Sequence, residues 1–291
     1  MPKISKILVL IDPNGENQDA LDKAEFLAHA TEARLELVGI YYSSYFEDGH
    51  YFDPIQASEL REQVLTAHKL ELENIAAGVR EQGLDAEAVV RWGHPSYKEL
   101  NELITNANST LIIKATKHHN KLVRLVLTNE DWDLIRNCSV PLLLVKGRPW
   151  SKNPVFLTAV DPEHVNDKPA SLDTKMIAYA ESLTQEVGGA VHLFHSDWIP
   201  PFMGVYSLTV DEGERREKLL EFARKSEIDT SYCHWSDSPL EKSLPDAVEE
   251  VDASVVVMGA ISRSRLDQVI IGSSAERILD LVDRDVLIVR P

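Results

Sequence analysis

A glycine-rich loop near the end of the chain has the residue types needed to bind an anion. The loop follows an apolar run, starts at Gly259 and ends in Gly272-Ser273-Ser274. Glycine allows backbone N–H groups to approach a phosphate closely, and a helix beginning at Ser273 or Ser274 would direct its unpaired N–H groups at that anion. The loop therefore predicts a binding site for phosphate groups, to which Arg263 could add a positive charge.

The same residues also fit an explanation that needs no ligand. Ser273-Ser274-Ala275-Glu276 contains the S-x-x-E pattern of a capping box, in which the two polar side chains bond the first backbone N–H groups of their own helix. Arg263 and Arg265 can likewise lie in solvent. Capping and anion binding are compatible, so the sequence leaves both roles open.

No pattern in the sequence supports catalysis or metal binding. The GxxxxGK[ST], GxSxG and HExxH motifs are absent, and no nucleophile is paired with a base. His118 and His119 are adjacent, whereas His192 and His195 lie on an expected strand and face opposite sides of it. We therefore expect no catalytic residue, no metal ligand and a non-enzymatic protein.

The charge balance excludes two classes of partner. The chain of 291 residues has 30 Lys and Arg against 47 Asp and Glu, which gives a formal net charge of -17. Such a chain repels phosphodiester backbones and anionic lipid, so we expect neither a broad nucleic-acid surface nor a membrane surface. The N-terminal apolar run is too short for a signal peptide or a membrane span. With Cys138 and Cys233 expected to be reduced and buried, these features favour a cytoplasmic protein.

The chain consists of two similar halves. An apolar run ending in Asp12-Pro13 recurs as one ending in Asp161-Pro162, an offset of 149 residues. Ala24-Glu25-x-Leu27 recurs as Ala180-Glu181-x-Leu183, and the expected elements have the same order in both halves. A repeat of this length indicates duplicated domains. We predict a first domain at residues 1–148 and a second at 149–291, with a linker at 147–154 that contains Gly and Pro.

Each half alternates short apolar runs with helical patterns. The expected strands lie at 7–11, 34–41, 86–91, 111–114 and 142–146 in the first half, and at 156–160, 191–195, 229–235, 255–259 and 286–290 in the second. In one helix, Leu60, Val64, Ala67 and Leu70 have the spacing of a single buried stripe. The alternation requires parallel crossovers, so the fold class is α/β, with two tandem doubly wound parallel sheets. Ligands of such sheets bind at the carboxyl ends of the strands.

The loop after the fourth strand of the second half resembles the nucleotide-binding motif of the universal stress protein family, G-x-x-G-x9-G-[S/T]. Gly259, Gly272 and Ser273 match this motif at the correct spacing, while Ser262 replaces its second glycine. If that position needs a left-handed backbone, serine costs roughly 1–2 kcal/mol, which weakens a site without abolishing it. The resemblance covers nearly the whole chain, because both halves look like the domain of that family.

The resemblance implies a stress-response protein whose second half binds ATP or AMP. Asp161 would face the adenine, and Met258 and Ser196 would line the base. It also implies that the two halves pair through their fifth strands as an intrachain pseudo-dimer, and two such chains could associate further as a homodimer. The residues that would hold the ribose and phosphates are Gly259, Ser262, Arg263, Gly272, Ser273 and Ser274.

The first half has lost the residues of this loop. At an offset of 145 residues, Lys114 stands at the position of Gly259 and Leu127 at that of Gly272. Long side chains would project where the family needs bare backbone, so we expect no conventional nucleotide site there. A basic cluster in the first half could instead bind an anion or an acidic partner, or lie in solvent. It consists of Lys114, Lys117, His118, His119, Lys121 and Arg124.

Aromatic residues after the second strand of each half suggest a different class of ligand. Such loops can line a pocket for an apolar or lipid-like small molecule, or form a lid packed on their own domain. A protein-interaction scaffold that binds no nucleotide is a further alternative. The aromatic loops contain Tyr41, Tyr42, Tyr45, Phe46, Tyr51 and Phe52 in the first half, and Trp198, Phe202, Met203 and Tyr206 in the second.

Overall fold

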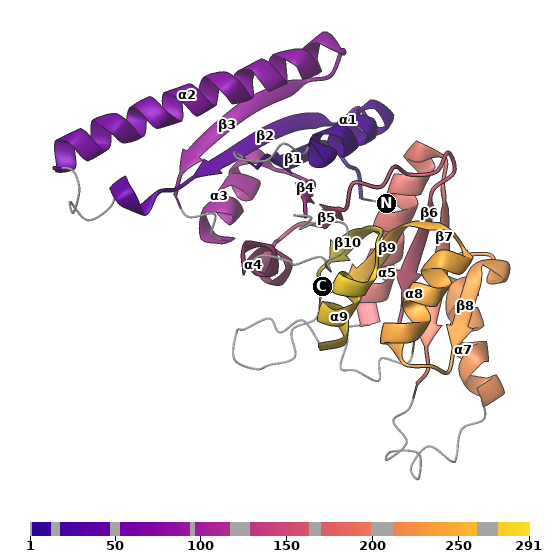
Figure 1. Cartoon of the computed structure of the whole chain (residues 1–291). Helices are drawn as coiled ribbons and strands as arrows, with labels where there is room; N and C mark the ends of the chain where they lie inside the picture. The colour runs from indigo at the N-terminus through magenta and orange to yellow at the C-terminus, as the bar shows by residue number, and fades with distance from the viewer. Residues whose placement is uncertain are drawn as a thin grey trace. The chain divides into compact units, whose positions relative to one another are not determined.

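The computed structural model describes residues 2–12, 18–46, 53–93, 97–116, 129–162, 170–198, 212–260 and 273–291. The chain divides into two compact units, one formed by residues 4–115 and 129–145 and the other containing residues 146–291 (Figure 1). Each unit is an α/β fold with a parallel sheet, which confirms the predicted fold class. The domain boundary between residues 148 and 149 stays a prediction.

The first unit contains a parallel sheet with the strand order β3-β2-β1-β4-β5. The strands are β1 (Lys6–Leu10), β2 (Arg34–Tyr41), β3 (Ala86–Trp92), β4 (Leu111–Ala115) and β5 (Leu142–Val145). The helices are α1 (Asp19–Thr31), η1 (Ser44–Phe46), α2 (Pro54–Glu81), α3 (Tyr97–Ala107) and α4 (Asn129–Asn137). Because parallel crossovers are right-handed, the change of direction between β1 and β4 places α1 and α2 on one face and α3 and α4 on the other.

The second unit has the same arrangement, with the strand order β10-β9-β6-β7-β8. Its strands are β6 (Val155–Ala159), β7 (Ala190–Ser196), β8 (Cys233–Ser236), β9 (Ala253–Gly259) and β10 (Asp285–Val289). Its helices are α5 (Ala170–Val187), α7 (Glu212–Lys225), η3 (Thr230–Tyr232), α8 (Leu240–Glu250) and α9 (Ser273–Leu281). The helices α8 and α9 pack against each other, as α3 and α4 do in the first unit.

The central strands of each sheet are buried on both faces. Ile7, Leu8 and Val9 of β1 have no exposed surface, and neither do residues 111–113 of β4 or 255–257 of β9. Continuous apolar runs of this kind are typical of parallel sheets that helices cover on both sides. The core therefore fixes the strands, and the residues that follow their carboxyl ends acquire defined positions.

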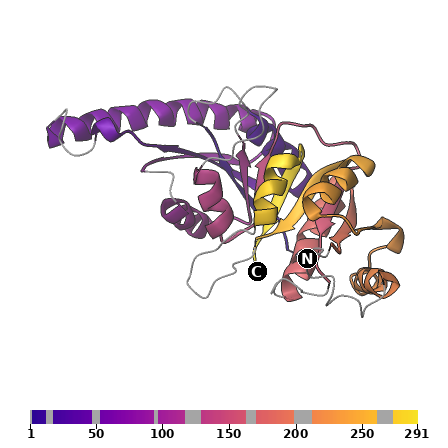
Figure 2. The same ribbon diagram turned by 60° about the horizontal axis from the view of Figure 1, so that its bottom comes forward.

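The amino-terminal part of α2 contacts the sheet through more polar residues than the sequence pattern predicted. Leu70 of the expected stripe is 65% exposed. Arg61 instead lies 5.2 Å from the ring of Trp92, and His68 stacks on Tyr41 with ring centroids 3.7 Å apart. Cation–π and stacking contacts take the place of aliphatic packing here, so apolar spacing alone could not predict them. Figures 1 and 2 both show α2 running along β2 and β3.

Two expectations about the segment before β8 were wrong. The expected strand at 229–235 begins only at Cys233, because residues 230–232 form η3. Oδ1 of Asp229 accepts a hydrogen bond from the backbone N–H of Ser231 at 2.8 Å, and such an aspartate favours a turn over a strand. Cys233 is only partly buried, whereas Cys138 is buried as expected.

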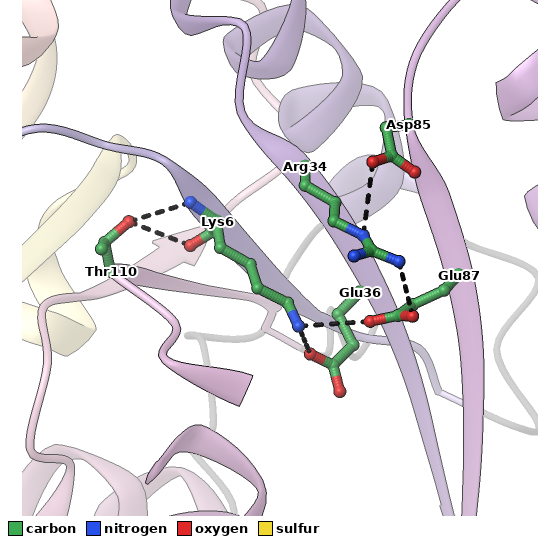
Figure 3. A network of polar contacts seen from close by, with 6 residues as sticks. All are labelled: Lys6, Arg34, Glu36, Asp85, Glu87 and Thr110. Carbon is green, nitrogen blue, oxygen red and sulfur yellow. Dashed lines mark hydrogen bonds and ion pairs between the residues drawn. The ribbon is translucent and has the colours of Figure 1, made fainter. Parts of the chain in front are cut away.

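Charged side chains connect the amino ends of β1, β2 and β3 (Figure 3). Nζ of Lys6 lies 2.6 Å from Oε2 of Glu36 and 3.2 Å from Oε1 of Glu87. The guanidinium of Arg34 donates to Oε2 of Glu87 at 2.8 Å and also pairs with Asp85. Glu36 is 5% exposed, so its carboxylate depends on the nearby ammonium group for compensation of its charge.

The start of the expected linker is attached to the second unit. Oδ1 of Asp285 accepts from the backbone N–H of Lys146 at 2.8 Å, and Oδ2 accepts from the indole of Trp150 at 2.7 Å. Nζ of Lys146 donates to the carbonyls of Leu279 and Val282 at 2.6 and 2.5 Å. Burial lowers the pKa of Lys146 to about 8, against the opposing effect of nearby aspartates. The ammonium group thus binds the carboxyl end of α9.

Candidate functional site

The carboxyl ends of three neighbouring strands lie along one edge of the second sheet. β6 pairs with β7 on one side and with β9 on the other, so the strand order changes direction at β6. This is the point where doubly wound sheets bind ligands. Asp161 follows β6, Ser196 ends β7, and Met258 and Gly259 end β9, so the structure brings these predicted residues to the same edge. Ser262, Arg263 and Gly272 lie outside the described residues.

Two buried groups hold the turn that follows β6. The backbone N–H of Asp161 donates to Oδ2 of Asp173 at 3.1 Å, and Asp173, in the first turn of α5, has no exposed surface. Nδ1 of His195 lies 2.9 Å from the carbonyl of Val160. Since a carbonyl only accepts, Nδ1 carries the proton and donates it to Val160. Sequence reasoning did not assign either side chain this role, because neither belongs to a motif.

The hydroxyl of Ser196 is oriented by the turn before α8. Its Oγ donates to the carbonyl of Ser238 at 2.8 Å, and that carbonyl also accepts from Oγ of Ser243 at 3.2 Å. The hydrogen of the Ser196 hydroxyl is therefore used within the protein, and the oxygen keeps lone pairs that can accept a hydrogen bond. This side chain suits a ligand that presents an amino group.

An ion pair that sequence reasoning missed adjoins Ser196. Nε of Arg215 lies 2.7 Å from Oδ2 of Asp197, and the two side chains are 19% and 10% exposed. Burial raises the pKa of Asp197, while the positive charges of Arg215 and His195 act in the opposite direction. The pair joins the end of β7 to α7, and no local sequence signal indicates which arginine reaches this aspartate.

Side chains of α5 pack closely against Gly259, which has no side chain of its own. A Cβ at this position would lie 2.7 Å from Cδ2 of Leu172 and 3.1 Å from Sδ of Met176, both on α5. The preceding residue, Met258, is 5% exposed. Glycine at this position therefore has a structural role in addition to any close approach of a ligand.

The helix α9 begins at the end of the glycine-rich loop. It spans Ser273–Leu281, which confirms the predicted helix start at Ser273 or Ser274. The first N–H groups of a helix lack partners within the helix and carry partial positive charge. The helix packs on α8, and Lys146 binds its carboxyl end.

An ion pair lies at the matching edge of the first unit. Lys114, which stands at the position of Gly259, places Nζ 2.5 Å from Oδ1 of Asp131. Asp131 lies in the first turn of α4 and is 2% exposed. Charged side chains thus meet where the second unit has bare backbone. The other residues of the basic cluster, Lys117, His118, His119, Lys121 and Arg124, lie outside the described residues.

Two of the four described aromatic residues of the first loop contact rings of their own unit, and Tyr45 is 62% exposed. Tyr41 stacks on His68, and Phe46 meets Trp92 edge-on with ring centroids 5.6 Å apart. The lid and the apolar pocket both stay predictions. In the second unit, Trp198 is 42% exposed. Tyr51, Phe52, Phe202, Met203 and Tyr206 lie outside the described residues.

Two other histidines of the second unit, His192 and His234, contact each other. Nδ1 of His192 and Nε2 of His234 are 2.9 Å apart, and Tyr232 stacks on the His192 ring. Within the described ranges, no group of three or more His, Cys, Asp or Glu is arranged to hold a metal ion. Nor does any helix in this part of the chain have the length and apolar character needed to cross a membrane.

Comparison with known proteins identifies relatives along the whole chain. The sequence profile of the Universal stress protein family matches residues 3–146 and 165–290. Universal stress protein E of Photorhabdus laumondii is 25% identical over 303 residues, covering 100% of this chain and 96% of the relative. The Universal stress protein E homolog of Haemophilus influenzae is 24% identical, covering 99% of this chain and 98% of the relative.

Solved structures of universal stress proteins also align with nearly the whole chain. A Pseudomonas aeruginosa UCBPP-PA14 protein described as a universal stress protein aligns with a TM-score of 0.77 at 25% identity, covering 99% of this chain and 94% of that chain. A universal stress protein of Archaeoglobus fulgidus aligns with a TM-score of 0.65 at 17% identity, covering 97% of this chain and 98% of that chain, a likeness of fold alone. Two tandem copies of one domain therefore account for the whole chain.

Proposed function

Because the chain belongs to the universal stress protein family, whose members act in the stress response, we propose that its second unit binds an adenine nucleotide, ATP or AMP, without catalysing a reaction. The nucleotide lies at the carboxyl ends of β6, β7 and β9. The protein acts in the cytoplasm as a sensor whose state depends on this ligand.

One observation carries the proposal. The amino end of α9 follows Gly272 directly, in the unit where β9 ends in Gly259 rather than in a long side chain. A helix start with a glycine-rich approach provides unpaired backbone N–H groups and a partial positive charge for phosphate groups. The first unit has Lys114 and Asp131 in the corresponding place, so the same ligand is assigned to the second unit only.

Each residue of the site has a role that fits its surroundings. Ser196 accepts a hydrogen bond from the adenine amino group, because its own hydrogen is bound to the carbonyl of Ser238. Asp161, positioned through Asp173, faces the base, and Met258 borders it. The residues that hold ribose and phosphates are Gly259, Ser262, Arg263, Gly272, Ser273 and Ser274.

Thermal unfolding of the purified chain with ATP, AMP, GTP or a fatty acid tests the proposal. Adenine nucleotides should raise the unfolding temperature, since a ligand at about 100 times its dissociation constant stabilises by about 2.7 kcal/mol. A rise with the fatty acid alone would contradict the proposal and support an apolar ligand. A matched pair of variants locates the site: Gly272→Lys should abolish the shift, and Leu127→Lys, at the corresponding place in the first half, should leave it unchanged.

The assembly of the halves is a separate part of the proposal. Pairing through the apolar residues of the fifth strands, Leu142–Val145 and Leu287–Val289, would form an intrachain pseudo-dimer, and further association would give a homodimer of chains. Light scattering at several concentrations measures the second step directly, because a monomeric mass at all of them would exclude the homodimer.

A further inference from the structure

The ion pair of the first unit lies where a ligand of this sheet would bind. β1 pairs with both β2 and β4, so the strand order changes direction between β1 and β4. Ligands of doubly wound sheets bind outside the carboxyl ends of the strands at such a point. Lys114 lies at that end of β4, and Asp131 is near the start of α4. Their contact therefore occupies the edge that corresponds to the proposed nucleotide site of the second unit.

Both charges of the pair are shielded from solvent. The side chain of Asp131 is 2% exposed and that of Lys114 is 18% exposed, with Nζ and Oδ1 2.5 Å apart. A buried carboxylate is strongly unfavourable unless a cation and hydrogen-bond donors compensate its charge. The position of Asp131 in the first turn of a helix adds to that compensation. The first unit thus has surroundings that stabilise one negative charge at this point.

The sequence of the second unit lacks the lysine of this pair at the matching position. At the same offset of 145 residues, Gly259 replaces Lys114 and Glu276 replaces Asp131. An acidic residue is present in both helices, but a lysine stands at the end of the matching strand only in the first unit. The difference between the units is therefore the lysine, whose ammonium group binds the carboxylate in the first unit.

We propose that the carboxylate of Asp131 is a built-in anion of the first unit, which takes the place of an external phosphate beside Lys114. Removal of the carboxylate leaves a site that a small oxyanion, such as inorganic phosphate, can occupy. The ion pair of the first unit then stays formed whether or not a nucleotide is present. This inference does not depend on nucleotide binding by the second unit.

Rescue of Asp131→Ala by inorganic phosphate tests the proposal. Thermal unfolding of the full chain is measured at increasing phosphate and constant ionic strength. The variant should unfold at a lower temperature than the unsubstituted protein, and phosphate should restore at least half of the difference along a saturating curve. The unsubstituted protein reports any effect of phosphate on the second unit. The rescue should persist when Gly272→Lys is added, which separates it from failure of the proposed nucleotide site.

Three variants control the measurement. Asp131→Ala/Lys114→Met lacks the ammonium group and should not be rescued. Asp131→Ser should be rescued in the same way and serves if the alanine variant does not fold. Glu249→Ala removes a carboxylate that pairs with the buried guanidinium of Arg284 at 2.9 Å, and phosphate should affect it no more than the unsubstituted protein. Equal stabilisation of all variants, or no saturable rescue of either Asp131 variant, would overturn the proposal.

Discussion

The two units share one strand order but differ at the carboxyl edge of the sheet. In the first, Lys114 extends from the end of β4 to Asp131 on α4. In the second, Gly259 ends the matching strand, and the helix α5 packs close to its backbone through Leu172. The buried strands are alike in both units, so the fold does not depend on either arrangement. Duplication has preserved the core and changed the residues at its ends.

The amino ends of the two sheets differ as well. Glu36 lies opposite Leu8, and His192 lies opposite Leu157, and these two leucines are related by the repeat offset of 149 residues. Glu36 belongs to the charged network with Lys6 (Figure 3). His192 instead shares a hydrogen bond with His234. At the same position of the fold, the first unit thus has a carboxylate that pairs with a lysine. The second unit has a histidine that bonds another histidine.

Breaking the ion pair at the first edge should have the largest effect. Lys114→Met leaves the carboxylate of Asp131 buried without its cation, and the free energy of unfolding should fall by about 2–4 kcal/mol, because removal of one partner of a buried pair is costly. Lys114→Met/Asp131→Leu should recover most of this loss. Urea unfolding followed by circular dichroism measures both, and additive losses would show that the two side chains do not depend on each other.

Adding a side chain at the second edge should have the next largest effect. Gly259→Ala places a Cβ 2.7 Å from Cδ2 of Leu172, and overpacking should lower the free energy of unfolding by about 1–2 kcal/mol. Gly78→Ala is the matched control, since a Cβ at this helical glycine meets nothing within 4 Å, and it should stabilise by about 0.5–1 kcal/mol. Chemical denaturation compares them, and an unchanged midpoint for Gly259→Ala would contradict the packing role.

Acidification should distinguish the amino ends of the two sheets. Burial, together with His234, lowers the pKa of His192 from 6.5 to about 4, so in this interval the unfolded chain binds a proton that the folded chain does not. Stability should therefore fall as the pH decreases from about 6.5 toward 4, by about 1 kcal/mol once partial exposure is discounted. The variant His192→Phe should show a weaker pH dependence over this window. Parallel urea titrations at several pH values provide the measurement.

Removal of one hydroxyl from the proposed site should have the smallest effect. Ser196→Ala eliminates the acceptor for the adenine amino group, and the lost hydrogen bond should weaken binding by about 0.5–1.5 kcal/mol. Ser243→Ala is the control, because its Oγ bonds the same carbonyl of Ser238 but is not assigned to the ligand. Calorimetric titration with AMP compares the two variants, and equal affinities would remove Ser196 from the site.

The elements of this protein could be predicted from sequence where apolar runs determine them. The central strands and the start of α9 lie where the pattern places them, because burial on both faces and a helix start have local signals. The contacts of the amino-terminal part of α2 could not be predicted, since Arg61 and His68 make them with aromatic rings. The groups around Asp161 and Asp197 also lacked a signal, because their partners His195, Asp173 and Arg215 become neighbours only through the fold.

The hydrogen bonds of Lys146 determine where a fragment that contains only the second copy of the domain should begin. This lysine precedes the predicted boundary, yet its ammonium group binds the carbonyls of Leu279 and Val282 at the carboxyl end of α9. A fragment that starts at residue 149 discards that group and leaves both carbonyls to find other donors. A fragment that starts at residue 146 keeps both hydrogen bonds, and with them three residues that the repeat assigns to the first copy.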